Sequence, residues 1–73
     1  MDKVVAYGVV SNCVYVNVRK RPSLESDIVS ILDIGTTVSI LSEHSKFYRI
    51  KLGDLYGFIM KEYIAKSAVI PDE

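Results

Sequence analysis

Two residues with reactive side chains, Cys13 and His44, are the first candidates for chemistry in this chain. A cysteine and a histidine can form a nucleophile–base pair, but the pair needs a third group that orients the histidine and a site for the substrate. His44 lies in a polar tetrad at 43–46, and Cys13 stands at the start of an alternating apolar segment. Neither context supplies the missing groups. We therefore expect no catalytic residues, with Cys13 as a small packing residue and His44 as an exposed loop residue.

Metal and cofactor sites are not indicated either. One cysteine and one histidine make no spaced ligand set, and no glycine cluster resembles a phosphate-binding loop. No carboxylate pair stands out from the nine acidic residues. We expect no metal and no cofactor, which leaves binding as the function to consider.

Residues suited to binding fall on the outward phase of two alternating segments. In residues 13–19 the valines at 14, 16 and 18 form one face, which is typical of a half-buried strand, and in residues 56–60 Ile59 faces inward. The opposite faces carry Tyr15, Asn17, Arg19, Tyr56 and Phe58. Exposed aromatic rings suit ligand capture because they offer large rigid surfaces, although they could equally cover a thin core.

The elements that position these residues are short strands in one small domain. A chain of 73 residues holds a single domain. Extended patterns occur at 13–19, 28–34, 36–42, 48–52, 56–60 and 65–69, separated by a loop at 20–27, a hairpin loop at 43–46, a turn at 53–54 and one helical turn at 61–64. No segment shows a sustained helical stripe, so we expect an all-β fold.

Several motifs in order resemble those of bacterial SH3 domains, over about residues 8–64. They are Val16-Asn17-Val18-Arg19 with Pro22-Ser23, Leu32-Asp33-Ile34-Gly35-Thr36, Phe47-Tyr48-Arg49-Ile50-Lys51-Leu52, Gly57-Phe58-Ile59 and Tyr63-Ile64. The resemblance implies an SH3-like barrel of about five to seven short strands with a short 3-10 turn near the C-terminus. Arg21 replaces the usual glycine, and phenylalanine stands at 47 and 58 where relatives often have tryptophan.

The expected domain organisation has three parts. Residues 1–7 are an N-terminal edge strand or linker, residues 8–66 are the barrel, and residues 67–73 are a flexible tail. The N-terminus carries Asp2 and no small-residue cleavage site, so we expect no signal peptide, and no apolar stretch is long enough to cross a membrane.

The resemblance also implies a function, because such domains typically hold cell-wall hydrolases, including phage endolysins, on peptidoglycan through its peptide portion. Tyr63 resembles the tyrosine that lines the peptide groove of SH3 domains. Tyr48, in phase with Ile50, is expected to pack, which leaves Phe47 for the ligand. The expected ligand-binding residues are Tyr15, Asn17, Arg19, Arg21, Phe47, Tyr56, Phe58 and Tyr63.

The expected partner is therefore peptidoglycan, through its cross-bridge or stem peptide, which would place a parent lytic protein at the cell wall. Arg19 or Arg21 could form a bidentate pair with a wall-peptide carboxylate, although a solvated loop is the alternative. A second hypothesis is a protein-interaction or assembly module that binds a peptide segment of another protein. A third, nucleic-acid binding, depends on the basic run at 19–21 beside Tyr15, and the formal net charge of zero argues against it.

Overall fold

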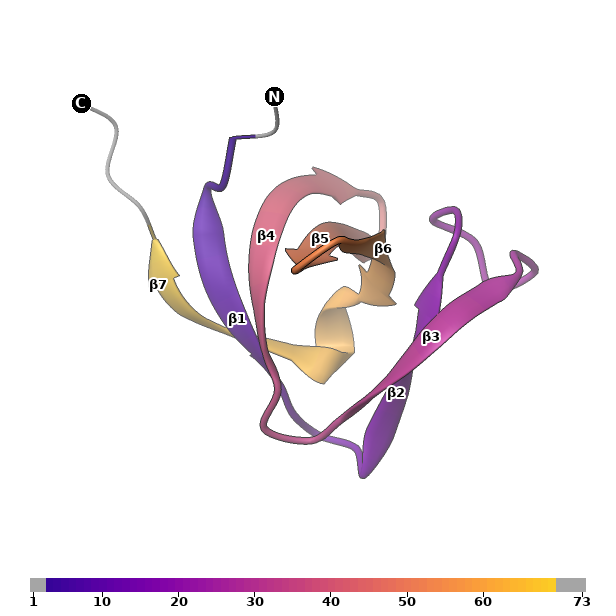
Figure 1. Cartoon of the computed structure of the whole chain (residues 1–73), viewed down its shortest axis with the longest axis horizontal. Helices are drawn as coiled ribbons and strands as arrows, with labels where there is room; N and C mark the ends of the chain where they lie inside the picture. Colours follow the sequence, from indigo (N-terminus) through magenta and orange to yellow (C-terminus); the bar gives the residue numbers. More distant parts are fainter. Residues whose placement is uncertain (1–2, 70–73) are drawn as a thin grey trace.

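The computed structural model describes residues 3–69 and consists of seven short strands and one 3-10 turn (Figure 1). The elements are β1 Ala6–Val10, β2 Tyr15–Arg19, β3 Ile28–Asp33, β4 Thr37–His44, β5 Phe47–Leu52, β6 Leu55–Met60, η1 Lys61–Tyr63 and β7 Ile64–Val69. The all-β prediction is confirmed, and so is the 3-10 turn near the C-terminus.

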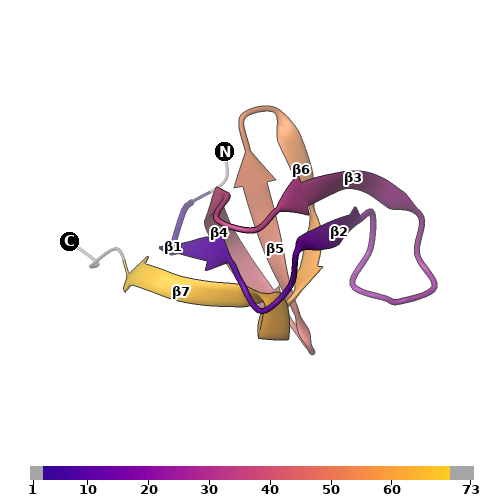
Figure 2. The same ribbon diagram turned by 90° about the horizontal axis from the view of Figure 1, so that it is seen from below.

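All seven strands belong to one antiparallel sheet in the order β3-β2-β6-β5-β4-β1-β7. Register shifts in β1 at Tyr7/Gly8, in β2 at Val18/Arg19 and in β4 at Ile40/Ser42 interrupt the pairing. Bulges of this kind bend a strand and increase its twist, which allows a single sheet to curl around its own core. Figures 1 and 2 show the result: β3 and β7 end the sheet on opposite sides of the molecule, around β4, β5 and β6.

The core is built from the inward residues of every strand. The ten members of the buried cluster are aliphatic: Ala6, Val10, Val16, Val18, Leu32, Val38, Ile40, Ile50, Ile59 and Ile64. Among the described residues no polar side chain is buried. The expected inward positions of Val16, Val18, Ile50 and Ile59 are confirmed. Val14 is 78% exposed, because β2 begins only at Tyr15 and Val14 lies in the bend before it.

One hairpin turn is shorter than the sequence pattern predicts, and the next has the predicted length. The strand expected at 36–42 continues to His44, so the predicted loop at 43–46 is reduced to the pair Ser45-Lys46. Ser45 adopts a φ of 56°, in the left-handed region that a tight hairpin turn requires. Gly53, with a φ of 61°, turns the next hairpin where the pattern placed it.

Both ends of the barrel extend beyond the predicted boundaries. β1 starts at Ala6 and lies between β4 and β7, so residues 6 and 7 belong to an interior strand rather than to an edge or linker. β7 continues to Val69, because residues 68 and 69 pair with Tyr7 and Ala6. The remaining positions of the predicted tail, 70–73, lie outside the described residues, as do residues 1 and 2.

Candidate functional site

A groove forms between β2, the loop at 20–27 and the junction of β6 with η1. It has a volume of about 160 Å³ and is lined by Val16, Asn17, Arg19, Leu24, Met60 and Tyr63. Three of these residues, Asn17, Arg19 and Tyr63, belong to the predicted set. We call this hollow the Met60 groove.

The loop at 20–27 forms one wall of the groove, the loop wall, and hydrogen bonds from β2 and within the loop hold it in place. Arg19 Nη1 donates to the carbonyl oxygens of Leu24, at 2.8 Å, and Ser26, at 3.1 Å. The Arg21 amide donates to Ser26 Oγ at 2.8 Å, and the Lys20 amide donates to the Asp27 carbonyl at 2.9 Å. A loop bonded in this way loses little conformational freedom when a ligand binds beside it. The bonds made by Arg19 also change its expected role, because they direct its Nη1 to the loop and make it a positioning residue.

The close approach of β2 to β6 depends on Gly57. A Cβ atom at this position would meet the Val18 side chain and would lie 2.9 Å from the Arg19 carbonyl oxygen. Arg19 and Phe58 are paired across the same two strands. Glycine at 57 therefore lets β2 lie against β6, which brings the two walls of the Met60 groove together.

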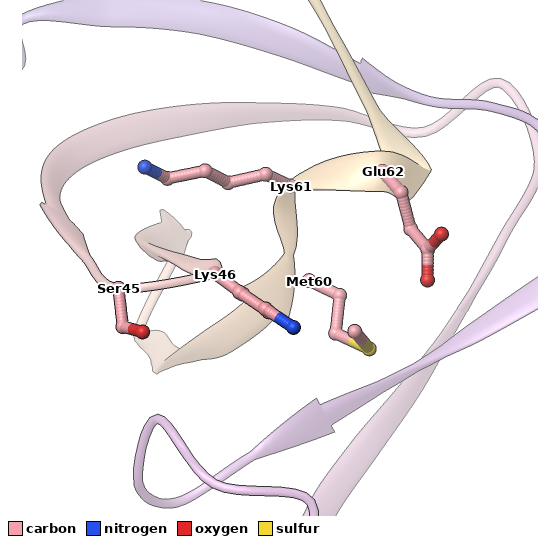
Figure 3. Close-up of a pocket in the computed structure, with 5 residues that line it drawn as sticks. All are labelled: Ser45, Lys46, Met60, Lys61 and Glu62. Atoms are coloured by element: carbon pink, nitrogen blue, oxygen red, sulfur yellow. The ribbon is translucent and has the colours of Figure 1, made fainter.

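Met60 also lines a second hollow of about 370 Å³, together with Ser45, Lys46, Lys61 and Glu62 (Figure 3). In Figure 3 the Lys46 ammonium and the Glu62 carboxylate lie on either side of the Met60 side chain, and Lys61 extends away from them. The Lys61 ammonium makes an ion pair with Glu43 Oε1 at 2.7 Å. The hydrogen bond from Lys61, and then its charge, hold the pKa of Glu43 below its ordinary value of 4.5. The 3-10 turn is tied to the β4–β5 turn by the Lys61 amide, which donates to the Lys46 carbonyl at 2.8 Å.

The other predicted site residues lie outside the Met60 groove. Tyr56 is on the outward side of β6, where Arg49 and Lys51 lie 5.6 and 5.5 Å from its ring centroid. Phe58 is on the same side and makes an edge-on contact with the His44 ring, with centroids 5.2 Å apart. The three rings thus lie on the β4–β5–β6 face and do not line the Met60 groove.

Tyr15 and Arg21 lie in two further places. Tyr15 is exposed at the start of β2, opposite Asp33. Arg21 lines a small hollow within the loop at 20–27, with Lys20, Glu25, Ser26 and Asp27. Neither residue lines the Met60 groove.

Phe47 is the predicted ligand residue that the structure buries. Its side chain is only 5% exposed, whereas Tyr48 is half-buried against the core and lies under the ammonium groups of Lys61 and Lys66. The expectation that Tyr48 packs is therefore confirmed, whereas the expectation that Phe47 meets the ligand is wrong, because its ring is buried.

Leu24 and Met60 are groove residues that the sequence analysis missed. Met60 shares the outward phase of Tyr56 and Phe58, so continuing that alternation by one step would have found it. Leu24 is a large apolar residue in an otherwise polar loop, and such a residue often contacts a ligand or a partner.

The sites considered for chemistry show no reactive arrangement. Cys13 Sγ lies 3.1 Å from the Ser11 carbonyl oxygen and packs against the core, and His44 Nε2 is 2.7 Å from Ser42 Oγ. Within residues 3–69, no group of three histidine, cysteine, aspartate or glutamate side chains could hold a metal ion. No helix in the described part of the chain has the length and apolar character needed to cross a bilayer.

The fold is a small antiparallel barrel with a groove beside β2 and η1. The family model of the bacterial SH3 domain matches residues 14–65, which is most of the chain. The chain therefore belongs to the bacterial SH3 domain family, whose members are small non-catalytic binding modules. No curated protein matches the chain.

Proposed function

We propose that this domain attaches a bacterial or phage lytic protein to the cell wall by binding a peptide segment of peptidoglycan in the Met60 groove. The observation that carries the proposal is the composition of the groove. An apolar floor from Val16, Leu24 and Met60 lies beside the amide of Asn17 and the ring of Tyr63. Ligand sites commonly combine apolar surface with a few polar groups that fix orientation.

The second hollow suits the charged groups of a wall peptide. Such peptides carry both amines and carboxylates, and the Met60 side chain separates Glu62 from Lys46 (Figure 3). A peptide that lies across Met60 could direct an amine to Glu62 and a carboxylate to Lys46, where charge-assisted hydrogen bonds are stronger than neutral ones. Binding of this kind needs no net charge on the protein, in agreement with the balanced composition.

Co-sedimentation with purified peptidoglycan tests the proposal. The parent domain is expected to bind the wall fraction and to release no soluble fragments from it. Tyr63→Ala or Asn17→Ala should weaken binding by about thirtyfold, because truncating a central anchor costs roughly 2 kcal/mol. Melting curves must accompany the pull-down, since Tyr63 also packs against the core.

The matched control is Tyr56→Ala, which removes a tyrosine from the β4–β5–β6 face. It should leave wall binding unchanged if the ligand lies in the Met60 groove. Loss of binding in Tyr56→Ala together with normal binding in Tyr63→Ala would move the site to the outer face. A parent domain that stays in the supernatant with several wall chemistries would refute the attachment function itself.

A further inference from the structure

Exposed apolar side chains are concentrated on the β2–β3 hairpin. In the part of the chain that the structure describes, eleven large hydrophobic residues are exposed, and seven of them lie between positions 14 and 34. The seven are Val14, Tyr15, Leu24, Ile28, Val29, Ile31 and Ile34. Monomeric proteins usually scatter such residues singly, and a cluster of them marks an interaction surface.

The cluster coincides with an unprotected sheet edge. β3 ends the sheet, so one side of its backbone has no neighbouring strand (Figures 1 and 2). Edge strands are normally protected from pairing by lysine, proline or an inward charge. β3 contains no lysine, arginine or proline among its six residues, whereas β7, at the opposite edge, carries Lys66. Of the two edges, β3 is the one suited to pairing.

From these observations we infer that β3 is a self-association surface, on which two copies of the chain pair their β3 strands antiparallel about a two-fold axis. This goes beyond the attachment function proposed above and does not depend on it. A two-fold contact uses the same patch on both copies and closes on itself, so it gives a dimer rather than a filament. Ile28 of each copy then lies at the Asp33 end of the other.

The distribution of side chains along β3 fits this arrangement. The apolar residues Val14 and Ile34 lie at the Asp33 end, where the Ile34 amide donates to the Val14 carbonyl at 2.9 Å. The Ile28 end is apolar as well, because Leu24 is exposed in the loop that precedes it. Reversing one strand against the other therefore places the exposed apolar residues at the two ends of one copy opposite those of the other copy.

Charge complementarity favours a second copy as the occupant. Asp33 is the only charged residue in β3, and it lies at the C-terminal end of the strand. The Ile28 end adjoins Arg19, its partner across the hairpin, and the basic run continues through Lys20 and Arg21. Glu25 and Asp27 offset two of these three cations and leave one in excess. In the antiparallel pair, each Asp33 would lie opposite the unbalanced positive charge at the Ile28 end of the other copy.

The expected dimer is weak. Stable interfaces bury about 1,200–2,000 Å² in total, and pairing one six-residue strand with a strip of side chains covers less. Sedimentation equilibrium over roughly 10 μM to 1 mM should therefore show a monomer–dimer equilibrium rather than a fixed dimer. A reducing agent in all samples excludes dimers linked through Cys13.

Two variants test the surface, and a third is the matched control. Ile31→Lys places a charge at the centre of the edge, and Asp33→Lys places a cation against the basic run. Each should weaken dimerisation at least about tenfold. Val5→Lys makes the same change at an exposed apolar residue away from β3 and should leave the equilibrium unchanged. Melting curves establish that all three variants are folded.

The inference is overturned if the parent is monomeric at 1 mM, or if Val5→Lys abolishes a dimer that both β3 variants retain. An extended peptide that pairs with β3 of a monomeric parent would also overturn it, and would identify a different protein as the occupant of this edge. Protection of β3 amides from hydrogen exchange that rises with protein concentration would support the two-fold strand pair.

Discussion

The strands β3 and β5 have the same length and opposite environments. Each has six residues, and β3 is the richer in large aliphatic side chains, with Ile28, Val29, Ile31 and Leu32. Only Leu32 is buried in β3, whereas Ile50 of β5 is completely buried. β5 has β4 and β6 as neighbours, and β3 has only β2. Position in the sheet, rather than hydrophobicity, decides which aliphatic residues form the core.

The central strands and the β2–β3 hairpin therefore have different roles. β1, β4, β5 and β6 supply most of the completely buried side chains, while the β2–β3 hairpin contributes Val16, Val18 and Leu32 to the core and leaves its other aliphatic residues exposed. The hairpin also holds the loop wall of the Met60 groove through Arg19. We therefore expect mutations in the central strands to affect folding and mutations in the hairpin to affect binding or association.

The largest effect is expected from truncating the same residue type in the two regions. Ile50→Ala and Ile59→Ala each leave a cavity at a fully buried site and should lower the free energy of unfolding by about 2–5 kcal/mol. Ile31→Ala, at a side chain that is 56% exposed, should cost less than about 0.5 kcal/mol. Chemical denaturation at a protein concentration low enough to keep the chain monomeric measures all three. Similar losses for Ile31 and Ile50 would contradict the division between edge and centre.

A smaller effect is expected where the two regions meet, at Gly57. Alanine at this position would bring a methyl group against the Val18 side chain and within 2.9 Å of the Arg19 carbonyl oxygen. The strands must move apart, at a cost of about 1–3 kcal/mol. Because Arg19 lies on the displaced strand, Gly57→Ala should also weaken ligand binding, whereas Ile59→Ala should weaken binding only in proportion to the unfolded fraction. Chemical denaturation and wall co-sedimentation of both variants separate the effect on stability from the effect on binding. A Gly57→Ala domain as stable as the parent would show that β2 and β6 are not in close contact.

Alternation and turn residues were sufficient to predict the elements of the central strands. Ile50 and Ile59 were correctly placed inward, and Gly53 marks the expected turn. The same pattern failed at Val14 and could not distinguish the edge strand β3 from a central one. Burial there depends on which strands are neighbours, and a local pattern carries no information about pairing between distant segments.

The candidate site was harder to predict, because its walls come from segments far apart in the sequence. Asn17 was expected from its outward phase and Tyr63 from the resemblance to SH3 domains, and both line the Met60 groove, but Tyr15 and Tyr56 of the same predicted set lie elsewhere. An outward phase identifies accessible residues and does not show which of them converge. The role of Arg19 depends on two loop carbonyl groups, which any residue type supplies, so residue identities alone could not reveal it.

The smallest expected effect concerns the ion pair that joins the 3-10 turn to β4. Lys61 holds the pKa of Glu43 below 4.5, so the pair stabilises the fold above that pH, and the contribution is lost as the pH falls through the lowered pKa. Both side chains are partly in solvent, which limits the contribution and makes it sensitive to salt. Glu43→Gln should therefore lower the melting temperature slightly at about pH 7 in low salt, and its effect should shrink as the pH falls through the lowered pKa of Glu43.

Melting curves of the parent and Glu43→Gln at about pH 7 and about pH 3, each in low and high salt, measure this contribution, and Lys61→Met completes a double-mutant cycle. Both single variants lose the ion pair at neutral pH, and Lys61→Met also loses the contact of the ammonium with the Tyr48 ring. Once Lys61 is replaced, Glu43→Gln should therefore cause no further loss. A destabilisation by Glu43→Gln that is as large at about pH 3 as at about pH 7, and that salt does not change, would mean that the side chain contributes through packing of its stem instead of its charge. In that case the 3-10 turn, which carries Tyr63 into the Met60 groove, would be held chiefly by its backbone bond to the β4–β5 turn.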